Sequence, residues 1–142
     1  MAAFLRQRNG GMIAGGRFAK VNPDGNPANW TELNGVLRMS SDGSWDNDWR
    51  LDIQCGDGQK DVSVSSLASD SAGNIYVGGL FSTPGSDGRR NLARFNANGE
   101  LDTTWRVDTD GEVLALAMDE DGQLFVGGLS LRSAEYVSPT WP

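Results

Sequence analysis

Internal repetition constrains the fold of this 142-residue chain more than any other feature of its sequence. The segment SLASDSAGNIYVGGL at residues 66–80 returns 49 positions later as ALAMDEDGQLFVGGL, and a degraded copy, GGMIAGGRF, lies at residues 10–18. A second motif, LRMSSDGSWDNDWRL at residues 37–51, returns 56 positions on as ARFNANGELDTTWRV. Self-similarity at such a spacing is typical of repeat architectures, in which each unit buries its apolar face against the next.

Each unit has the pattern of antiparallel β structure. The runs at residues 62–67 and 113–117 alternate small and apolar residues, and glycine turns join them to further apolar runs at 74–81 and 123–131. Asp42-Gly43 and Asn98-Gly99 mark a second hairpin in each unit, because both dipeptides favour tight turns between strands. No segment has helical periodicity. The sequence therefore predicts an all-β fold with four strands in each complete unit.

Four antiparallel strands in units of this length are typical of propeller blades. The chain resembles the delta-sixty repeat, a β-propeller repeat family of uncertain function, over about residues 8–131. The family pattern in the best-preserved copy falls on Asp70, Gly73, Gly78, Gly79, Arg94, Gly99, Asp102 and Trp105. The other copies supply Gly15, Gly16, Arg38, Gly43, Asp46, Trp49, Gly127 and Gly128. The resemblance implies a β-propeller but no particular function, because one fold hosts many functions.

The repeated residues have expected structural roles. Across the hairpins, Arg94 is expected to pair with Asp102, and Arg38 with Asp46, each pair contributing about 0.2–1 kcal/mol. The Trp49 and Trp105 indoles are expected to lie between blades. The Gly-Gly pairs are expected to allow the backbone of one blade to approach the next.

About ten strands are predicted, which make two and a half blades. We expect a single repeat domain at 1–131, composed of a first blade (1–61), a second blade (62–111) and a half blade (112–131), followed by an extended tail at 132–142. A closed propeller needs about four or more blades. The prediction is therefore a partial, open β-propeller whose uncovered faces require copies of the chain, another protein or a longer chain.

Composition excludes several classes of function. Histidine is absent and cysteine occurs once, at Cys55, so the chain has no Ser–His or Cys–His catalytic pair and no internal disulfide. Acidic residues outnumber basic ones by 19 to 12, which argues against binding to nucleic acid. No signal peptide or run of apolar residues long enough to cross a membrane is recognisable. We expect neither an enzyme nor insertion into a membrane.

Two sets of side chains are candidates for binding. Clustered carboxylates are either turn residues or a weak calcium site, and we expect no other metal or cofactor. The calcium candidates are Asp108, Asp110, Asp119 and Asp121. The aromatic residues Trp30, Tyr136 and Trp141 are candidates for contacts with partners, although Trp30 is as well suited to cap its own loop.

The leading hypothesis is a non-catalytic structural or protein-interaction module that assembly completes, for example as a component of a virion. The alternative is a fragment of a longer bacterial surface or secreted protein that binds a glycan or a protein. A carboxylate-dependent hydrolase is a third interpretation. It is disfavoured because Asp46 and Asp102 occupy the same place in two repeats, which indicates a structural role.

Overall fold

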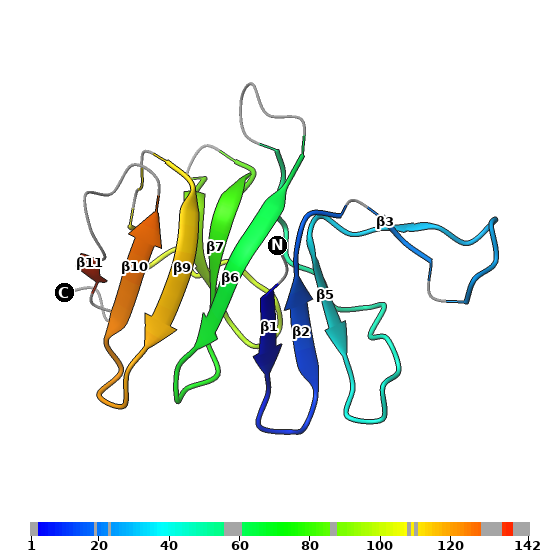
Figure 1. Ribbon diagram of the computed structural model, residues 1–142, viewed down its shortest axis with the longest axis horizontal. Coiled ribbons are helices and arrows are strands. Elements are labelled where there is room, and N and C mark those ends of the chain that lie inside the picture. The colour runs from blue at the N-terminus through cyan, green and yellow to red at the C-terminus, as the bar shows by residue number, and fades with distance from the viewer. Residues whose placement is uncertain are drawn as a thin grey trace.

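The computed structural model describes residues 3–18, 20–22, 24–55, 61–85, 88–107, 109, 111–128 and 135–137. Every regular element within these ranges is a β-strand, which confirms the all-β prediction. Figure 1 shows three antiparallel sheets side by side in an open row, with a short two-stranded arm at one end. The predicted partial, open propeller is therefore confirmed. The described part of the chain contains no helix that is long and apolar enough to cross a membrane.

Each of the three sheets in the row has three strands and forms one blade. The first blade consists of β1 (Ala3–Arg6), β2 (Met12–Gly15) and β5 (Val36–Met39). The middle blade consists of β6 (Ser63–Ser69), β7 (Ile75–Ser82) and β8 (Arg90–Phe95). The third blade consists of β9 (Val113–Met118), β10 (Leu124–Gly128) and β11 (Glu135–Val137).

An acidic side chain shapes the hairpin that opens the middle and third blades. Asp70 Oδ1 accepts backbone N–H groups two and four residues further on, at 2.9 and 3.0 Å. Asp119 Oδ1 repeats this arrangement at 3.0 and 2.8 Å. Gly73 and Gly122 follow with φ of 87° and 80°, a backbone conformation that favours glycine. The repeated Asp-x-x-Gly spacing thus fixes where each hairpin turns.

The fourth strand of the first and middle blades differs from the prediction, because it is reduced to a single β-bridge. These bridges join Phe95 to Leu101 in the middle blade and Met39 to Trp45 in the first. Asp102 N still donates to Arg94 O at 2.9 Å, but Asp102 Oδ1 then accepts the backbone N–H of Thr104 at 2.9 Å. This side-chain hydrogen bond turns the chain out of the ladder.

The segment predicted as an extended C-terminal tail at 132–142 contains a strand. Its strand β11 pairs antiparallel with β10, in a register that places Tyr136 opposite Phe125. The third unit therefore has three strands where the sequence predicted two. The first variable loop departs similarly, because β3 (Lys20–Val21) and β4 (Thr31–Glu32) pair to form the projecting arm in Figure 1.

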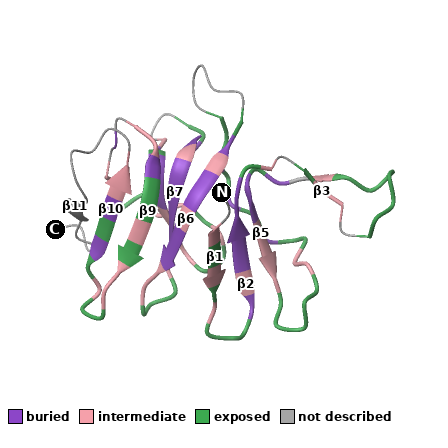
Figure 2. Cartoon of the chain, in the orientation of Figure 1, coloured by how far each residue is buried: buried purple, intermediate pink, exposed green. Residues whose placement is uncertain are grey.

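The core lies between the blades in two layers. One apolar cluster fills the space between the first and middle blades and includes Ile13, Val64, Val77 and Phe81. The second fills the space between the middle and third blades and includes Leu92, Val113, Leu124 and Val126. Figure 2 shows the consequence, because β6 and β7 of the middle blade are largely buried while β9 has a long exposed stretch.

Candidate interaction faces

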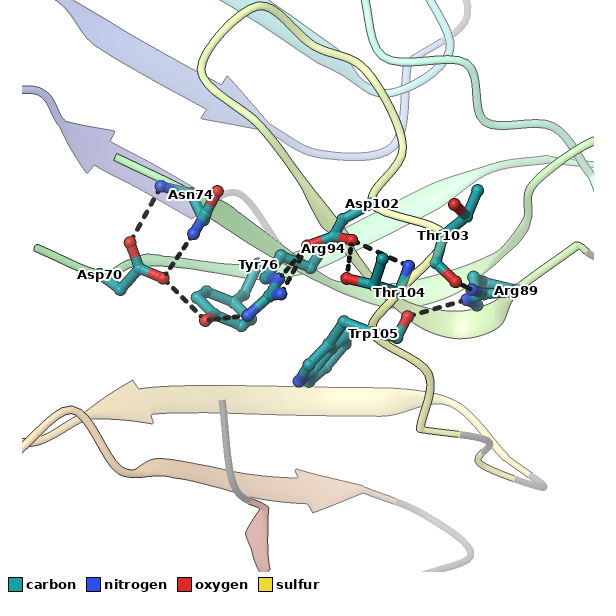
Figure 3. A network of polar contacts seen from close by, with 9 residues as sticks. All are labelled: Asp70, Asn74, Tyr76, Arg89, Arg94, Asp102, Thr103, Thr104 and Trp105. Atoms are coloured by element: carbon teal, nitrogen blue, oxygen red, sulfur yellow. Dashed lines mark hydrogen bonds and ion pairs between the residues drawn. The ribbon is translucent and has the colours of Figure 1, made fainter. Parts of the chain in front are cut away.

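A polar network holds the outer part of the middle blade together (Figure 3). The Arg94 guanidinium donates to Asp102 Oδ2 from Nε at 2.8 Å and from Nη2 at 2.5 Å, and to Tyr76 Oη from Nη1 at 3.3 Å. Tyr76 in turn donates to Asp70 Oδ2 at 2.9 Å. Trp105 packs edge-on against the Tyr76 ring, with 5.4 Å between their centroids. Arg94 on β8 thus contacts Asp102 and Tyr76 of β7, and through Tyr76 it is linked to Asp70 in the hairpin turn.

The first blade repeats the arginine pair in a more exposed setting. Arg38 donates to Asp46 Oδ2 from Nε at 3.0 Å and from Nη2 at 2.5 Å, and its Cζ lies 4.9 Å from the centroid of the Trp49 ring. The Trp49 indole donates to Ala97 O of the middle blade at 3.1 Å. The side chains of this pair are 27% and 26% exposed, against 12% and 20% for Arg94 and Asp102.

The network shifts the pKa of its acidic groups. At Asp46, hydrogen bonds from Arg38 lower the pKa of the carboxyl below its ordinary value. At Asp102, burial acts to raise the pKa, but hydrogen bonds from Thr104 and Arg94 outweigh it and leave the pKa lowered. Burial is the main reason why the pKa of Tyr76 rises to about 12. Both aspartates are therefore stabilised as anions, which suits a structural ion pair.

Contact between successive blades follows one rule: a glycine of one blade lies under two branched side chains of the next. These sets are Gly15 with Val64 and Leu67, and Gly78 with Val113 and Leu116. A Cβ atom at Gly15 would lie 2.5 Å from Val64 Cγ1. A Cβ atom at Gly78 would lie 2.6 Å from Val113 Cγ1. Each blade therefore has a small face that receives the following blade and a bulky face that packs on the preceding one.

In the middle and third blades, the second glycine of each pair has a different role from the one predicted. A Cβ atom at Gly79 or Gly128 would overlap a carbonyl oxygen of the paired strand in the same sheet, from Ser63 and Glu112 respectively. Gly16 has a third role, because its carbonyl accepts the N–H of Val64 in the middle blade at 3.0 Å. In the first two blades, the first glycine of each pair lies under side chains of the next blade. Gly43 and Gly99 lie in the second hairpins, where φ is 86° and 90°.

Among the described residues, no further blade packs on the small face of the third blade. Phe125 occupies the position of Tyr76, but Phe125 is 39% exposed whereas Tyr76 is fully buried. Its cross-strand partner Ala117 is also exposed. Gly127 occupies the position of Gly78, yet a Cβ atom there would meet only Ala115 of its own sheet, at 4.0 Å. This face, composed of Ala115, Ala117, Phe125 and Gly127, is called the third-blade face below.

The bulky face of the first blade is uncovered as well. Phe4, Ala14 and Leu37 are cross-strand neighbours, as are Arg6, Met12 and Met39, and strand alternation places both rows on the side away from the middle blade. Phe4 is 65% exposed, and Met12, Leu37 and Met39 are half-buried. The residues Phe4, Met12, Leu37 and Met39 are called the first-blade face below.

The predicted aromatic contact residues lie at separate places. Trp30 is 56% exposed at the end of the loop that joins β3 to β4, where it directly precedes β4. Hydrogen bonds order the loop that leads to it, because Asp24 accepts from Asn29 Nδ2 at 2.7 Å and from Asn26 N at 2.9 Å. The backbone of Tyr136 lies in β11, opposite that of Phe125. Trp141 lies outside the described residues.

Two of the four calcium candidates lie among the described residues, and two do not. Asp108 and Asp110 lie outside the described residues. Asp119 and Asp121 lie in the β9–β10 hairpin, where Asp119 Oδ1 accepts the N–H of Asp121 as a turn residue. Among the described residues, no three acidic or cysteine side chains are grouped so that they could hold a metal ion. The structure thus gives Asp119 a role in a turn.

Sequence reasoning missed two buried polar residues at the start of the middle blade's third strand. Arg89 is 1% exposed and donates to the carbonyl oxygens of Trp105 and Thr103, both at 3.1 Å (Figure 3). Asn91 has a φ of 65° and accepts the N–H of Phe81 at 3.1 Å through Oδ1. Neither lies in a segment that repeats, so no internal comparison could reveal it.

Comparisons with known families agree with this architecture. Residues 53–80 match a family described as a β-propeller repeat. Residues 73–104 match a family described as a β-propeller domain of unknown function, DUF5122. No curated protein matches the chain. The predicted resemblance to a β-propeller repeat family is confirmed, and the matches centre on the middle blade, where the repeat is best preserved.

Proposed function

We propose that this chain of β-propeller repeats is a non-catalytic protein-interaction module that assembly completes, with the first-blade face and the third-blade face as its docking surfaces. The observation that carries the proposal is the exposure of Phe4, which is 65% exposed on the first-blade face. On the third-blade face Phe125 is 39% exposed, whereas its counterpart Tyr76 is fully buried by the following blade. Contiguous apolar surface of this kind marks interaction sites in soluble proteins, because its burial releases about 25 cal/mol per Å².

Two further observations support a role without catalysis. The two carboxylates that the sequence analysis weighed for hydrolysis, Asp46 and Asp102, each accept two hydrogen bonds from an arginine. They also occupy matching positions in successive blades, as expected for residues that fix strand register. We expect a panel of chromogenic glycosides to show no turnover; activity abolished by Asp102→Asn would contradict the proposal.

Binding of the apolar dye 8-anilinonaphthalene-1-sulfonate tests whether the two faces present apolar surface that can bind a partner. Such dyes fluoresce on exposed apolar surface. At a concentration at which the chain is monomeric, we expect dye fluorescence that Phe125→Glu and Phe4→Glu each reduce. Ser71→Glu is the matched control, because Ser71 is an exposed residue of the β6–β7 hairpin and lies on neither face. Fluorescence that none of the three variants changes would contradict the proposal.

A further inference from the structure

We propose that the arm of the first blade is a binding site for neutral carbohydrate, in which one sugar ring stacks on the indole of Trp30. The arm consists of β3, β4 and the loop that joins them. It is distinct from the first-blade face and the third-blade face. The proposal therefore adds a second function to the protein-interaction module and does not depend on it.

The arm is an addition to the repeated blade. In the middle blade, residues 83–89 connect the corresponding strands β7 and β8, and they contain no aromatic residue. In the first blade, the connection between β2 and β5 is longer, at residues 16–35, and it forms the arm that extends away from the three sheets in Figure 1. A blade forms without such an arm, so packing within the repeat does not account for its presence.

Hydrogen bonds within the loop order it without help from a blade. Asp24 Oδ2 accepts from Asn29 Nδ2 at 2.7 Å, and Asp24 Oδ1 accepts from Asn26 N at 2.9 Å. Asn26 Oδ1 accepts from Ala28 N at 3.0 Å, and Asn26 O accepts from Asn22 Nδ2 at 3.1 Å and from Asn29 N at 2.9 Å. Because the loop is already ordered, a ligand that binds there loses little affinity to the entropy of ordering it.

Trp30 supplies a flat apolar platform at the end of this loop. It is 56% exposed, and among the described residues of the arm no other large hydrophobic side chain is exposed. The face of an aromatic ring carries partial negative charge, which attracts the weakly positive C–H groups on the face of a sugar ring. A sugar that stacks in this way keeps the hydroxyl groups at its edge free to make hydrogen bonds.

The residues next to Trp30 suit those hydroxyl groups. Asn29 directly precedes it and Thr31 directly follows it. The register of β3 and β4, extended by one residue, places the backbone of Asn22 opposite that of Trp30. Amide and hydroxyl side chains contain both donors and acceptors, as sugar hydroxyls do. An aromatic platform beside neutral polar groups therefore matches the two kinds of surface on a sugar ring.

Charge and polarity favour neutral carbohydrate over other ligands. The chain has a formal net charge of −7, which disfavours anionic ligands such as sulfated or uronic acid polysaccharides. A tryptophan that anchors a protein partner is usually surrounded by contacts that exclude water. Around Trp30, by contrast, the directly adjacent residues Asn29 and Thr31 are polar. A neutral sugar meets both conditions.

Affinity electrophoresis in native gels tests the proposal. The gels contain one soluble neutral polysaccharide each (hydroxyethylcellulose, xyloglucan, galactomannan or dextran) and are compared with a gel that contains none. We expect at least one to retard the wild-type chain. Trp30→Ala should weaken that binding about 10-fold or more, because truncating an anchoring tryptophan removes much of the contact. Trp30→Phe should retain part of the binding, because it keeps an aromatic face.

Leu114→Ala is the matched control. Leu114 is also an exposed large hydrophobic residue, but it lies on β9 and belongs neither to the arm nor to the third-blade face as defined above. We expect this variant to be retarded like the wild type. Urea midpoints of all variants, measured in parallel, show whether any loss of binding comes from unfolding. We expect the midpoint of Trp30→Ala to match that of the wild type, because more than half of the Trp30 side chain is in solvent.

Three results would overturn the carbohydrate site. Migration that no neutral polysaccharide retards would leave a protein as the ligand class for Trp30. Retardation that Trp30→Ala leaves unchanged would place the binding site outside the arm. Stronger retardation by the acidic polysaccharides alginate and polygalacturonate would contradict the preference for a neutral ligand. Dye binding to the two blade faces is measured separately, so none of these results bears on the proposed function.

Discussion

The middle and third blades begin with nearly the same sequence and the same hairpin, yet they have different surroundings. Tyr76 and Gly78 of the middle blade lie beneath the third blade, whereas their counterparts Phe125 and Gly127 face outward. The local conformation is alike, because Asp70 and Asp119 make the same turn. The comparison shows that the repeat specifies a blade and its two faces, while the presence of a neighbour decides whether a face becomes core.

The largest effect is expected from removing the matched aromatic side chains. Tyr76→Ala should lower the free energy of unfolding by about 3–5 kcal/mol, because it leaves a cavity against Trp105. Phe125→Ala should cost about 1 kcal/mol or less, because its ring is partly in solvent already. Urea denaturation of the monomeric chain measures both. Equal losses would show that the third-blade face is covered within the monomer.

Filling the matched glycines should produce a smaller but equally asymmetric effect. Gly78→Val forces new atoms against Val113 and Leu116 and should destabilise the chain by about 1–3 kcal/mol. Gly127→Val should alter the stability of the monomer by no more than about 0.5 kcal/mol, because no atom of another blade lies there. Thermal unfolding of the two variants side by side checks this. A destabilised Gly127→Val monomer would contradict the assignment of that glycine to an open face.

The two arginine–aspartate pairs extend the comparison to the first blade. Asp102→Asn should cost about 1–3 kcal/mol, because it weakens hydrogen bonds to a largely buried arginine. Asp46→Asn should cost about 1 kcal/mol or less, because water screens the more exposed pair. Urea midpoints of the two variants report the difference. The reverse order would mean that stacking of Arg38 on Trp49 contributes more than burial does.

At alkaline pH, the stability of the chain should depend on the titration of Tyr76 in the middle blade. The pKa of Tyr76 is raised to about 12, whereas an unfolded tyrosine has a pKa of about 10. The folded state therefore holds the phenolic proton more tightly, so the stability present below pH 10 declines as pH rises toward 12. Tyr76→Phe should make stability less dependent on pH in this window. An unchanged slope would place the titration at another residue.

The sequence predicted the strands that belong to the repeat. It failed for segments that occur once in the chain. The glycine turns at Ala72-Gly73 and Asn98-Gly99 helped to locate β6, β7 and β8, because glycine readily adopts the positive φ that such turns need. The fourth strand was overpredicted, because the Oδ1 atoms of Asp46 and Asp102 accept backbone N–H groups that a longer ladder would have used. The arm and β11 were missed, because neither belongs to the repeat.

Part of the candidate site could be found from the sequence. Repetition identified the Arg94–Asp102 and Arg38–Asp46 pairs, since a matched spacing across a hairpin places the two side chains on one face. It did not separate the two glycines of each pair, because their environments depend on which side of the sheet faces the next blade. Arg89 is buried and donates to carbonyl oxygens of a segment about 15 residues later in the chain. No local sequence pattern predicts such a contact.

By itself, the sequence determined that this chain forms successive β-propeller blades. Hydrogen-bonded turns and strand alternation are local properties, so repeated residues give repeated blades. Only the tertiary structure decided which face of each blade is core, since burial depends on what lies within a few ångströms from another blade. Gly78 and Gly127 occupy the same place in the same motif, but Val113 and Leu116 of the next blade lie over Gly78, and no described residue of another blade lies over Gly127.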